Sequence, residues 1–232
     1  MAAKSGGGAR KQSQRMNAKR RSGREPRGDV SLSLERIVNN AINLLDDEGV
    51  DGMSMRRLAE RCGSGVMSLY WHIDTKEDVF DLALDSVLEY CGPSEMGEPQ
   101  DWRADVIHML EDWRASMLRH PWSASLLPRR ALGPNVLHRL ERLGSALSRA
   151  GVADADLNVV IWSLWNHVLG ATITRASFEF SDDDKAAAQQ RLTQLSERYP
   201  TIERSRLLLD DDWCGTFRKG LDFLLDGLMP KR

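Results

Sequence analysis

The 232-residue sequence lacks the features that mark secreted and membrane proteins. Its three cysteines, Cys62, Cys91 and Cys214, are far apart, and their spacing matches neither a metal site nor a redox pair. An odd number of scattered cysteines favours a reducing compartment over a disulfide-stabilised fold. The most apolar stretch, 157–173, is too short and too polar to span a bilayer, and residues 1–30 lack the apolar core of a secretory signal. We therefore expect a cytoplasmic protein with no membrane partner.

Strand signals are also missing. No segment alternates between apolar and polar residues and ends in hairpin turns, and no repeat of 20–50 residues is visible by eye. The apolar period is helical instead. Helices are predicted over 31–49, 54–62, 66–72, 74–90, 101–119, 134–150, 154–178, about 184–198 and 211–229. The fold class is therefore all-α.

Two of these helices have clear sequence signals. The first has one apolar face, formed at helical spacing by Leu34, Ile37, Val38, Ala41, Ile42 and Leu45. Ser31 or Ser33 is expected to cap its start, and Gly49 to end it. The fourth is expected to begin with a capping box in which Asp74 is the N-cap and Glu77 lies three residues on.

Charge is distributed unevenly along the chain. Residues 1–30 carry nine Lys/Arg against two acidic residues, a net charge of +7, and have no apolar period, so we expect a disordered basic arm. Residues 31–92 carry twelve acidic and five basic residues, a net charge of −7. The run Cys91-Gly92-Pro93 marks a boundary, and the predicted domains are 1–30, 31–92 and 93–232. The arm favours contact with a polyanion; a dispensable, solvated terminus is the alternative.

The stretch from Arg56 to His72, RRLAERCGSGVMSLYWH, has the strongest functional signal. Ala59 and Gly63 are four residues apart. A small residue lets two helices approach each other, and a glycine accommodates the turn between them. This pattern favours a helix-turn-helix, whose second helix projects its outer side chains into the major groove of DNA.

Residues 32–90 closely resemble the tetracycline-repressor (TetR) family of transcriptional regulators, above all at 63–79, Gly-Ser-Gly-Val-Met-Ser-Leu-Tyr-Trp-His-Ile-Asp-Thr-Lys-Glu-Asp-Val. The specific feature is a Leu-Tyr-x-His pattern, with a Lys four residues after the His, that follows an Ala-x-x-x-Gly helix. Met-Ser-Leu-Tyr and the segment 217–228 are similar to the subgroup nearest the tetracycline repressors. The resemblance implies an N-terminal three-helix helix-turn-helix domain that binds DNA, followed by a C-terminal helical domain for ligand binding and dimerisation.

The resemblance also assigns DNA contacts to individual residues. Arg56 would enter the major groove, where arginine reads guanine through two hydrogen bonds. Three residues begin the recognition helix and would lie nearest the base edges: Val66, Met67 and Ser68. Four residues would contact the phosphate backbone, which sets register rather than sequence: Tyr70, Trp71, His72 and Lys76.

These assignments have structural alternatives. Tyr70 could be a wedge between helices, Trp71 and His72 could cover the fourth helix, and Arg56 could pair with Glu60 one turn away. The sequence also departs from the family in two places. Ser64 stands where an apolar residue is usual, and apolar residues at 66 and 67 replace polar readers, which favours contact with thymine methyl groups.

The helix predicted at 154–178 is apolar over so much of its circumference that it must be buried on more than one side. The resemblance implies that it and the helix at 211–229 pair with their two-fold mates in a four-helix homodimer interface. The residues expected there are Leu164, Val168, Phe217, Leu221, Leu224 and Leu228. A core within one chain is the alternative.

Aromatic and methionine side chains of this domain suit an adaptable apolar cavity for a small molecule, itself apolar or aromatic. The expected lining is Trp102, Met109, Trp113, Met117, Trp162, Trp165, Asn166 and His167. The alternative is an ordinary core in which Asn166 and His167 have protein partners. No cofactor or metal is expected. The metal-binding glutamate of the tetracycline repressors falls on Thr174, and 121–131 offers no matching histidine.

The leading hypothesis is a homodimeric transcriptional repressor that a small molecule releases from a palindromic operator in double-stranded DNA. The resemblance implies that a swing of the fourth helix, Asp74 to Tyr90, links the two domains. One alternative is an architectural protein that binds DNA without sequence choice. The least favoured is an all-α enzyme, because the sequence contains no Gly-x-Ser-x-Gly, no His-Glu-x-x-His and no P-loop.

Overall fold

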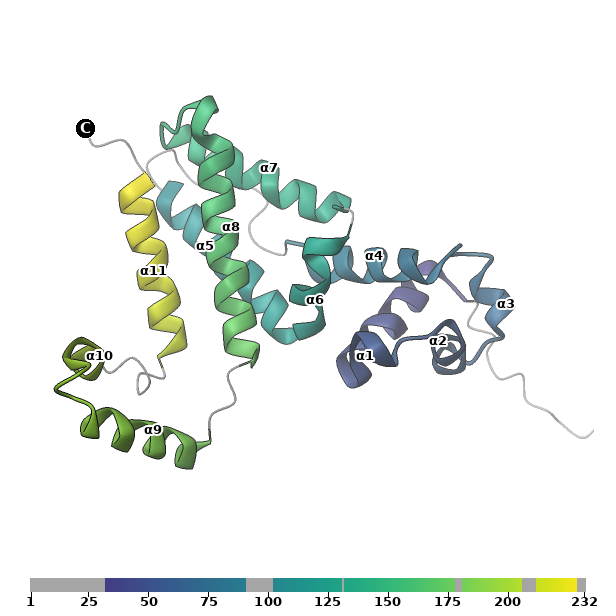
Figure 1. The fold of residues 1–232 in the computed structure, drawn as a ribbon. Coiled ribbons are helices and arrows are strands. Elements are labelled where there is room, and N and C mark those ends of the chain that lie inside the picture. Colours follow the sequence, from purple (N-terminus) through teal and green to yellow (C-terminus); the bar gives the residue numbers. More distant parts are fainter. Residues whose placement is uncertain (1–31, 91–101, 131, 178–180, 206–211, 229–232) are drawn as a thin grey trace, which may run out of the picture. The chain divides into compact units, whose positions relative to one another are not determined.

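Every regular element that the structure describes is a helix (Figure 1). The structure is a computed structural model, and it describes residues 32–90, 102–130, 132–177, 181–205 and 212–228. In chain order the elements are α1 (Leu34–Gly52), α2 (Met55–Cys62), α3 (Val66–Leu69), α4 (Lys76–Val87), α5 (Trp102–Arg119), α6 (Pro121–Leu126), the 3₁₀ helix η2 (Leu127–Arg129), α7 (Pro134–Arg149), α8 (Asp154–Ser177), α9 (Asp182–Gln194), α10 (Pro200–Ser205) and α11 (Trp213–Leu228). The all-α prediction is confirmed.

The helix ends follow the expected chemistry with small shifts. Ser33 caps α1 by accepting a hydrogen bond from the Arg36 amide, and the backbone leaves helical geometry at Gly49. Leu34, in the first turn, is exposed rather than part of the buried face. The capping box of α4 lies one residue later than predicted, with Thr75 as the N-cap and Asp78 as its partner. Both registers fit the sequence pattern, because Asp and Thr are both good N-cap residues.

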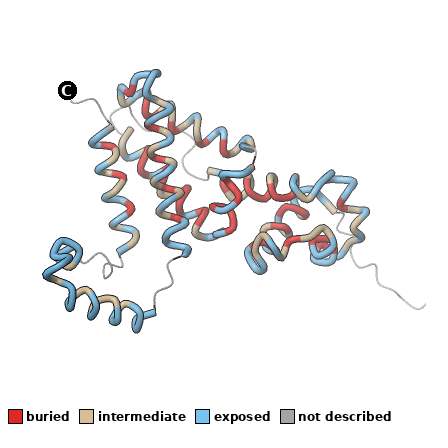
Figure 2. Tube along the Cα trace, viewed as in Figure 1, coloured by how far each residue is buried: buried red, intermediate tan, exposed pale blue. Residues whose placement is uncertain are grey.

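Helices α1 to α4 share one apolar core. α1 packs on α2 and α4, and α2 packs on α3. Ile37, Leu45, Leu58, Leu69 and Leu84 are each at most 2% exposed. Figure 2 shows this buried seam running through the purple and blue part of the chain in Figure 1.

The helices from α5 onward form a second layer of packing. α5, α7 and α8 pack on one another, and α11 and α6 pack on α8. Three short elements, α6, η2 and α10, lie where no helix is predicted. α9 and α10 contain no buried residue and stand out in pale blue in Figure 2.

The two layers meet within one unit, Leu32–Arg232. α1 packs on α6, and α4 packs on α6 and α7. The predicted boundary between 92 and 93 lies outside the described residues, as does the predicted arm at 1–30. The predicted domain boundary therefore stays a prediction, and the first four helices contact the later ones through α1, α4, α6 and α7.

Candidate DNA-binding surface and effector cavity

The turn between α2 and α3 depends on Gly63. Its backbone is left-handed (φ +66°, ψ 32°), and its amide donates to the carbonyl oxygens of Ala59 and Glu60. The next amide, of Ser64, donates to Ala59 O at 3.0 Å. Only glycine adopts this conformation without strain, so the Ala59–Gly63 pair forms the helix-turn-helix corner that the spacing predicts.

α3 is anchored by one side chain and exposes the rest. Leu69 is fully buried, whereas Met67 is 74% exposed and Trp71, in the turn that follows, is 87% exposed. Tyr70 and His72 are also exposed, and Val66 and Ser68 are half-buried. Large exposed apolar side chains on a small helix indicate a contact surface.

The structure bears on the alternatives for these residues. Tyr70, at 44% exposure, is not a buried wedge. Arg56 does pair with Glu60, with 3.0 Å between Nε and Oε1, but both side chains are largely exposed. A surface pair of this kind contributes about 1 kcal/mol or less. It therefore leaves Arg56 free to exchange Glu60 for another partner.

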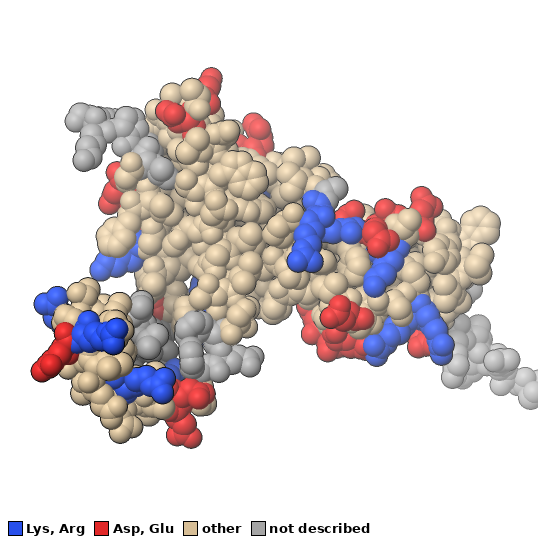
Figure 3. Space-filling view, in the orientation of Figure 1, with Lys and Arg blue, Asp and Glu red and all other residues tan. Residues whose placement is uncertain are grey.

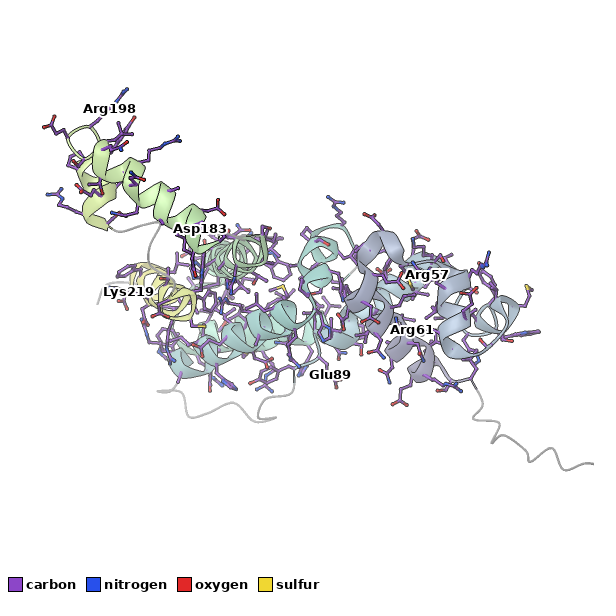
Figure 4. The ribbon with its side chains drawn as sticks, turned by 90° about the horizontal axis from the view of Figure 1, so that it is seen from below. Arg57, Arg61, Glu89, Asp183, Arg198 and Lys219 are labelled. Atoms are coloured by element: carbon purple, nitrogen blue, oxygen red, sulfur yellow. The ribbon has the colours of Figure 1, made fainter. Side chains whose placement is uncertain are left out.

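Several acidic residues of the first domain have partners within the protein. Arg57 of α2 pairs with Glu48, and Arg61 pairs with Asp47, both at the end of α1. Figure 4 labels both arginines, and Figure 3 shows blue and red side chains side by side over this domain. Asp46 accepts a hydrogen bond from Trp122 Nε1 at 2.7 Å. The net charge of −7 therefore includes carboxylates with structural partners.

α4 is tied to the second domain by its side chains. Asp81 accepts a hydrogen bond from Arg130 Nε at 2.6 Å. Asp85 accepts hydrogen bonds from the amides of Asn135 (3.0 Å) and Val136 (3.2 Å), at the start of α7. α7 has no side-chain cap of its own, so a carboxylate on α4 caps it from outside.

A buried arginine completes this link. Arg139 of α7 is 3% exposed and donates to the carbonyl oxygens of Leu88 and Glu89, just after α4. It also pairs with Asp112 of α5 at 2.8 Å. Burial raises the pKa of the neighbouring Tyr90 phenol, and nearby Arg142 partly opposes that shift. These links leave no signal in the sequence, because each one joins residues that are far apart along the chain.

The second domain contains a cavity of about 490 Å³ lined by η2, the middle of α7 and the first half of α8. The residues that line it are Leu127, Pro128, Arg130, Leu132, Leu140, Asn158, Ile161, Trp162 and Trp165. Trp165 also borders a narrower hollow, next to Trp113 and Met117, that has no room for a water molecule. The Trp165 and Trp113 rings meet edge to face at 4.7 Å.

Only part of the predicted cavity lining is brought together. Trp162 and Trp165 line the cavity, and Trp113 and Met117 lie in the adjoining hollow. Met109 is core, Trp102 packs against the core, and Asn166 is exposed on α8. His167 Nε2 lies 3.0 Å from the Phe217 carbonyl oxygen, and the two rings stack. His167 thus has protein partners, which is the alternative given for it in place of a ligand contact. A side chain at Gly220 would overlap the His167 ring, so this glycine permits the close packing of α8 on α11.

Four of the six residues predicted for the dimer interface are already buried within a single chain. Leu164, Val168, Phe217 and Leu221 are at most 4% exposed within a single chain. They form the contact between α8, α11 and α5, so they have no surface left for a partner chain to cover. Leu224 is half-buried and stays a prediction, and the side chain of Leu228 lies outside the described residues.

The same two helices expose a different apolar stripe. Val159 (58% exposed), Trp162 (59%) and Ile173 (43%) share one face of α8 with Asn166 and Gly170. Phe223 of α11 is 67% exposed. This set, Val159, Trp162, Ile173 and Phe223, is called the outer stripe below. Monomeric proteins seldom leave such a set in water.

Neither a helix long and apolar enough to cross a membrane nor a cluster of three metal-ligating side chains is found within the described residues. Burial raises the pKa of the Cys62 thiol, and Arg36 partly opposes the shift. Cys62 therefore stays protonated and packs as an apolar core residue.

A helix-turn-helix with an exposed second helix, joined to a separate helical domain, defines a class of DNA-binding regulators. Residues 37–83 match the family model for bacterial regulatory proteins of the tetR family. Residues 96–232 match the model for the tetracyclin repressor-like C-terminal domain. The chain belongs to the tetR family of transcriptional regulators.

Named relatives agree with this assignment. An HTH-type transcriptional regulator of Saccharopolyspora erythraea is 36% identical over 201 residues, covering 85% of this chain and 84% of that protein. The HTH-type transcriptional repressor DrrR1 of Streptomyces coeruleorubidus is 31% identical over 225 residues, covering 90% and 81%. The TetR family protein ActR of Streptomyces coelicolor, solved in complex with actinorhodin, has a TM-score of 0.71 and 27% identity, covering 86% and 96%.

Proposed function

We propose that the protein is a homodimeric repressor that binds a palindromic operator and leaves it when a small molecule occupies the cavity of the second domain. The observation that carries the proposal is the recognition surface, in which buried Leu69 holds exposed Met67 and Trp71 on a glycine-dependent corner. Such a protein acts on chromosomal DNA in the cytoplasm.

The roles on DNA follow from exposure and chemistry. Val66, Met67 and Ser68 face the base edges, and the apolar pair suits thymine methyl groups. Arg56 exchanges its exposed partner Glu60 for a guanine. The remaining contacts position the domain on the phosphate backbone: Tyr70, Trp71, His72 and Lys76.

A second copy of the chain covers the outer stripe. Two-fold pairing of α8 and α11 buries Val159, Trp162 and Phe223 on both chains, which are otherwise more than half exposed. Pairing of the same patch on two chains is the commonest oligomer symmetry. It also sets the spacing of the two recognition helices, because a dimer reads two half-sites on one face of DNA.

The cavity supports a ligand with a large apolar surface. Two tryptophans and several aliphatic side chains line about 490 Å³, which lies within the range of small-molecule sites. ActR has been solved with actinorhodin. We infer an aromatic effector of similar bulk for this protein, with Trp162 and Trp165 as its ring contacts.

Selection of bound fragments from random duplex DNA at physiological salt tests the operator. We expect enrichment of a two-fold palindrome. A Met67→Ala, Trp71→Ala double variant is expected to lose the enrichment, while Met55→Ala, a half-buried position on α2, keeps it. Tight binding without any enriched sequence would favour the architectural alternative instead.

The same selection without residues 1–30 tests the basic arm. We expect the enriched sequence to be unchanged and the affinity to fall, with a shallower dependence on salt. Removal of one phosphate-binding side chain reduces the slope of log K against log salt by about 0.9. An unchanged slope would identify the arm as a dispensable terminus.

A further inference from the structure

We propose that the effector carries an acidic group and that Arg130 binds it, exchanging its hydrogen bonds to α4 for bonds to the effector. This inference rests on the proposed function, because it assigns the chemistry of the ligand that releases the operator. It names Arg130 as the residue that joins the cavity to the DNA-binding domain.

Arg130 contacts both the effector cavity and α4. It is one of the residues that line the cavity. Its Nε donates to Asp81 Oδ1 at 2.6 Å, and its Nη2 donates to the carbonyl oxygen of Glu77. The guanidinium also lies over the Phe80 ring, 5.7 Å from its centre. Its side chain is 17% exposed; the hydrogen bond to Asp81 is partly buried, and the one to the Glu77 carbonyl lies at the surface.

The rest of the cavity wall has no formal charge. Of the nine described residues that line it, Arg130 is the only one with a charged side chain, and Asn158 is the only other polar one. An acidic group on a ligand in this cavity therefore has one cationic partner. Hydrogen bonds between ions are strengthened where apolar side chains exclude water.

A ligand acid and α4 compete for the same edge of the Arg130 guanidinium. A carboxylate binds arginine best through two parallel hydrogen bonds along one edge of the guanidinium. The Nε–Nη2 edge of Arg130 is held by Asp81 and by the backbone of Glu77. A ligand acid that takes this edge displaces both groups of α4.

Loss of these bonds acts on one end of α4 only. Glu77 and Asp81 lie in the first half of the helix, beside the helix-turn-helix. Asp85 still caps α7, and Arg139 still holds the backbone after α4. The N-terminal half of α4 thereby loses its hydrogen bonds to Arg130, while the α7 contacts and the Trp122–Asp46 hydrogen bond between α6 and α1 stay in place. The exchange therefore turns the DNA-binding domain about these remaining contacts.

Two fluorescent probes that share an aromatic framework test the exchange. 8-Anilinonaphthalene-1-sulfonate (ANS) is anionic, and N-phenyl-1-naphthylamine (NPN) lacks the sulfonate. We expect Arg130→Gln to weaken ANS binding by roughly tenfold or more, as for loss of a charged hydrogen bond, and to leave NPN binding within about twofold. The matched control is Arg129→Gln, which removes an exposed neighbouring charge and is expected to change neither probe.

A second pair of variants tests competition with α4. Asp81→Asn removes the carboxylate that holds Arg130 and is expected to tighten ANS binding severalfold. Glu77→Gln removes a charge one turn away whose side chain is exposed, and it is expected to have a much smaller effect. Hydrogen exchange of the α4 amides supplies the conformational readout: saturating ANS should speed exchange of residues 76–81 in the wild-type protein, but not in Arg130→Gln.

Several results would overturn the proposal. They are failure of ANS to bind the wild-type protein, equal loss of both probes in Arg130→Gln, no gain in Asp81→Asn, and no change in α4 exchange. Retained NPN binding and helical content show that the variants fold. None of these measurements uses DNA, so a negative probe result would not contradict operator binding. Conversely, failure of the operator selection would not contradict the probe results.

Discussion

Truncation of Phe223 distinguishes the outer stripe from the core that lies beneath it. Phe223 is 67% exposed in one chain, which corresponds to ~130 Å² of a phenylalanine side chain. At ~25 cal/mol per Å², covering that surface contributes ~3 kcal/mol per chain. Alanine keeps the first carbon, so Phe223→Ala loses roughly 2 kcal/mol per chain, or about 4 kcal/mol per symmetric dimer. The dimer Kd is then expected to rise by a factor of about 10³.

Leu164→Ala is the matched control on the neighbouring helix. Leu164 is fully buried within the chain, so its truncation is expected to lower the free energy of unfolding by about 2–5 kcal/mol. It removes no surface from the interface, and the dimer should persist under native conditions. Charged residues at Leu164 or Leu221 are expected to unfold the domain rather than to produce folded monomers.

Sedimentation over a dilution series, together with urea unfolding, separates the two effects. We expect Phe223→Ala to sediment as a monomer at concentrations where the wild type is a dimer, with unchanged helical content. Leu164→Ala should sediment as a dimer and unfold at a lower urea concentration. The reasoning is refuted if Phe223→Ala remains dimeric throughout the series, or if Leu164→Ala dissociates as readily.

Three further outcomes are expected. Arg56→Ala should reduce discrimination between bases at one operator position by about 1–3 kcal/mol, whereas Lys76→Ala should weaken binding to all sequences alike and reduce the slope of log K against log salt by about one. Binding titrations on matched and mismatched operators check this difference. A uniform loss of affinity from both variants would contradict the division of roles. The Ser64 hydroxyl is buried and has no hydrogen-bond partner among the described residues, so Ser64→Ala should raise the free energy of unfolding by up to about 1 kcal/mol. Ser54→Ala removes the cap of α2 and should lower the free energy of unfolding by about 1 kcal/mol. Urea unfolding measures both changes. Asp85→Ala should lower the free energy of unfolding by about 1–2 kcal/mol, because it removes the cap of α7. Asp85→Asn should lower it less, because the amide oxygen still accepts a hydrogen bond. Equal stability of both variants and the wild type would show that the cap has no energetic role.

The helix-turn-helix was predictable because its determinants are local. The small residue at Ala59 and the left-handed glycine at Gly63 lie within one turn of each other, and Leu69 is at the right spacing to anchor α3. Local signals also place the ends of α2, α5, α7, α8 and α11 to within a residue or two, whereas the ends of α1, α3, α4 and α9 are displaced by up to about four residues. At the start of α4 the pair Asp74-Thr75 offers two N-caps, and packing selects the second.

The second domain was less predictable because helical spacing identifies an apolar face but not its partner. α8 is apolar nearly all round, so the sequence cannot distinguish the stripe that meets α11 within the chain from the stripe left for another chain. Leu164 and Val159 differ by five positions and have opposite environments. The cavity lining was missed for a related reason, since α6 and η2 are too short to show a period and Arg130 follows them.

The negative charge of the DNA-binding domain is explained by the same long-range contacts. Asp46, Asp81 and Asp85 point their carboxylates at the second domain, and Asp47 and Glu48 hold arginines of α2. Asp46, Asp81 and Asp85 therefore join the first domain to the second, whereas Asp47 and Glu48 stabilise the packing of α2 on α1. A more basic first domain would bind DNA without help, but it would lose the carboxylates through which the second domain holds α4.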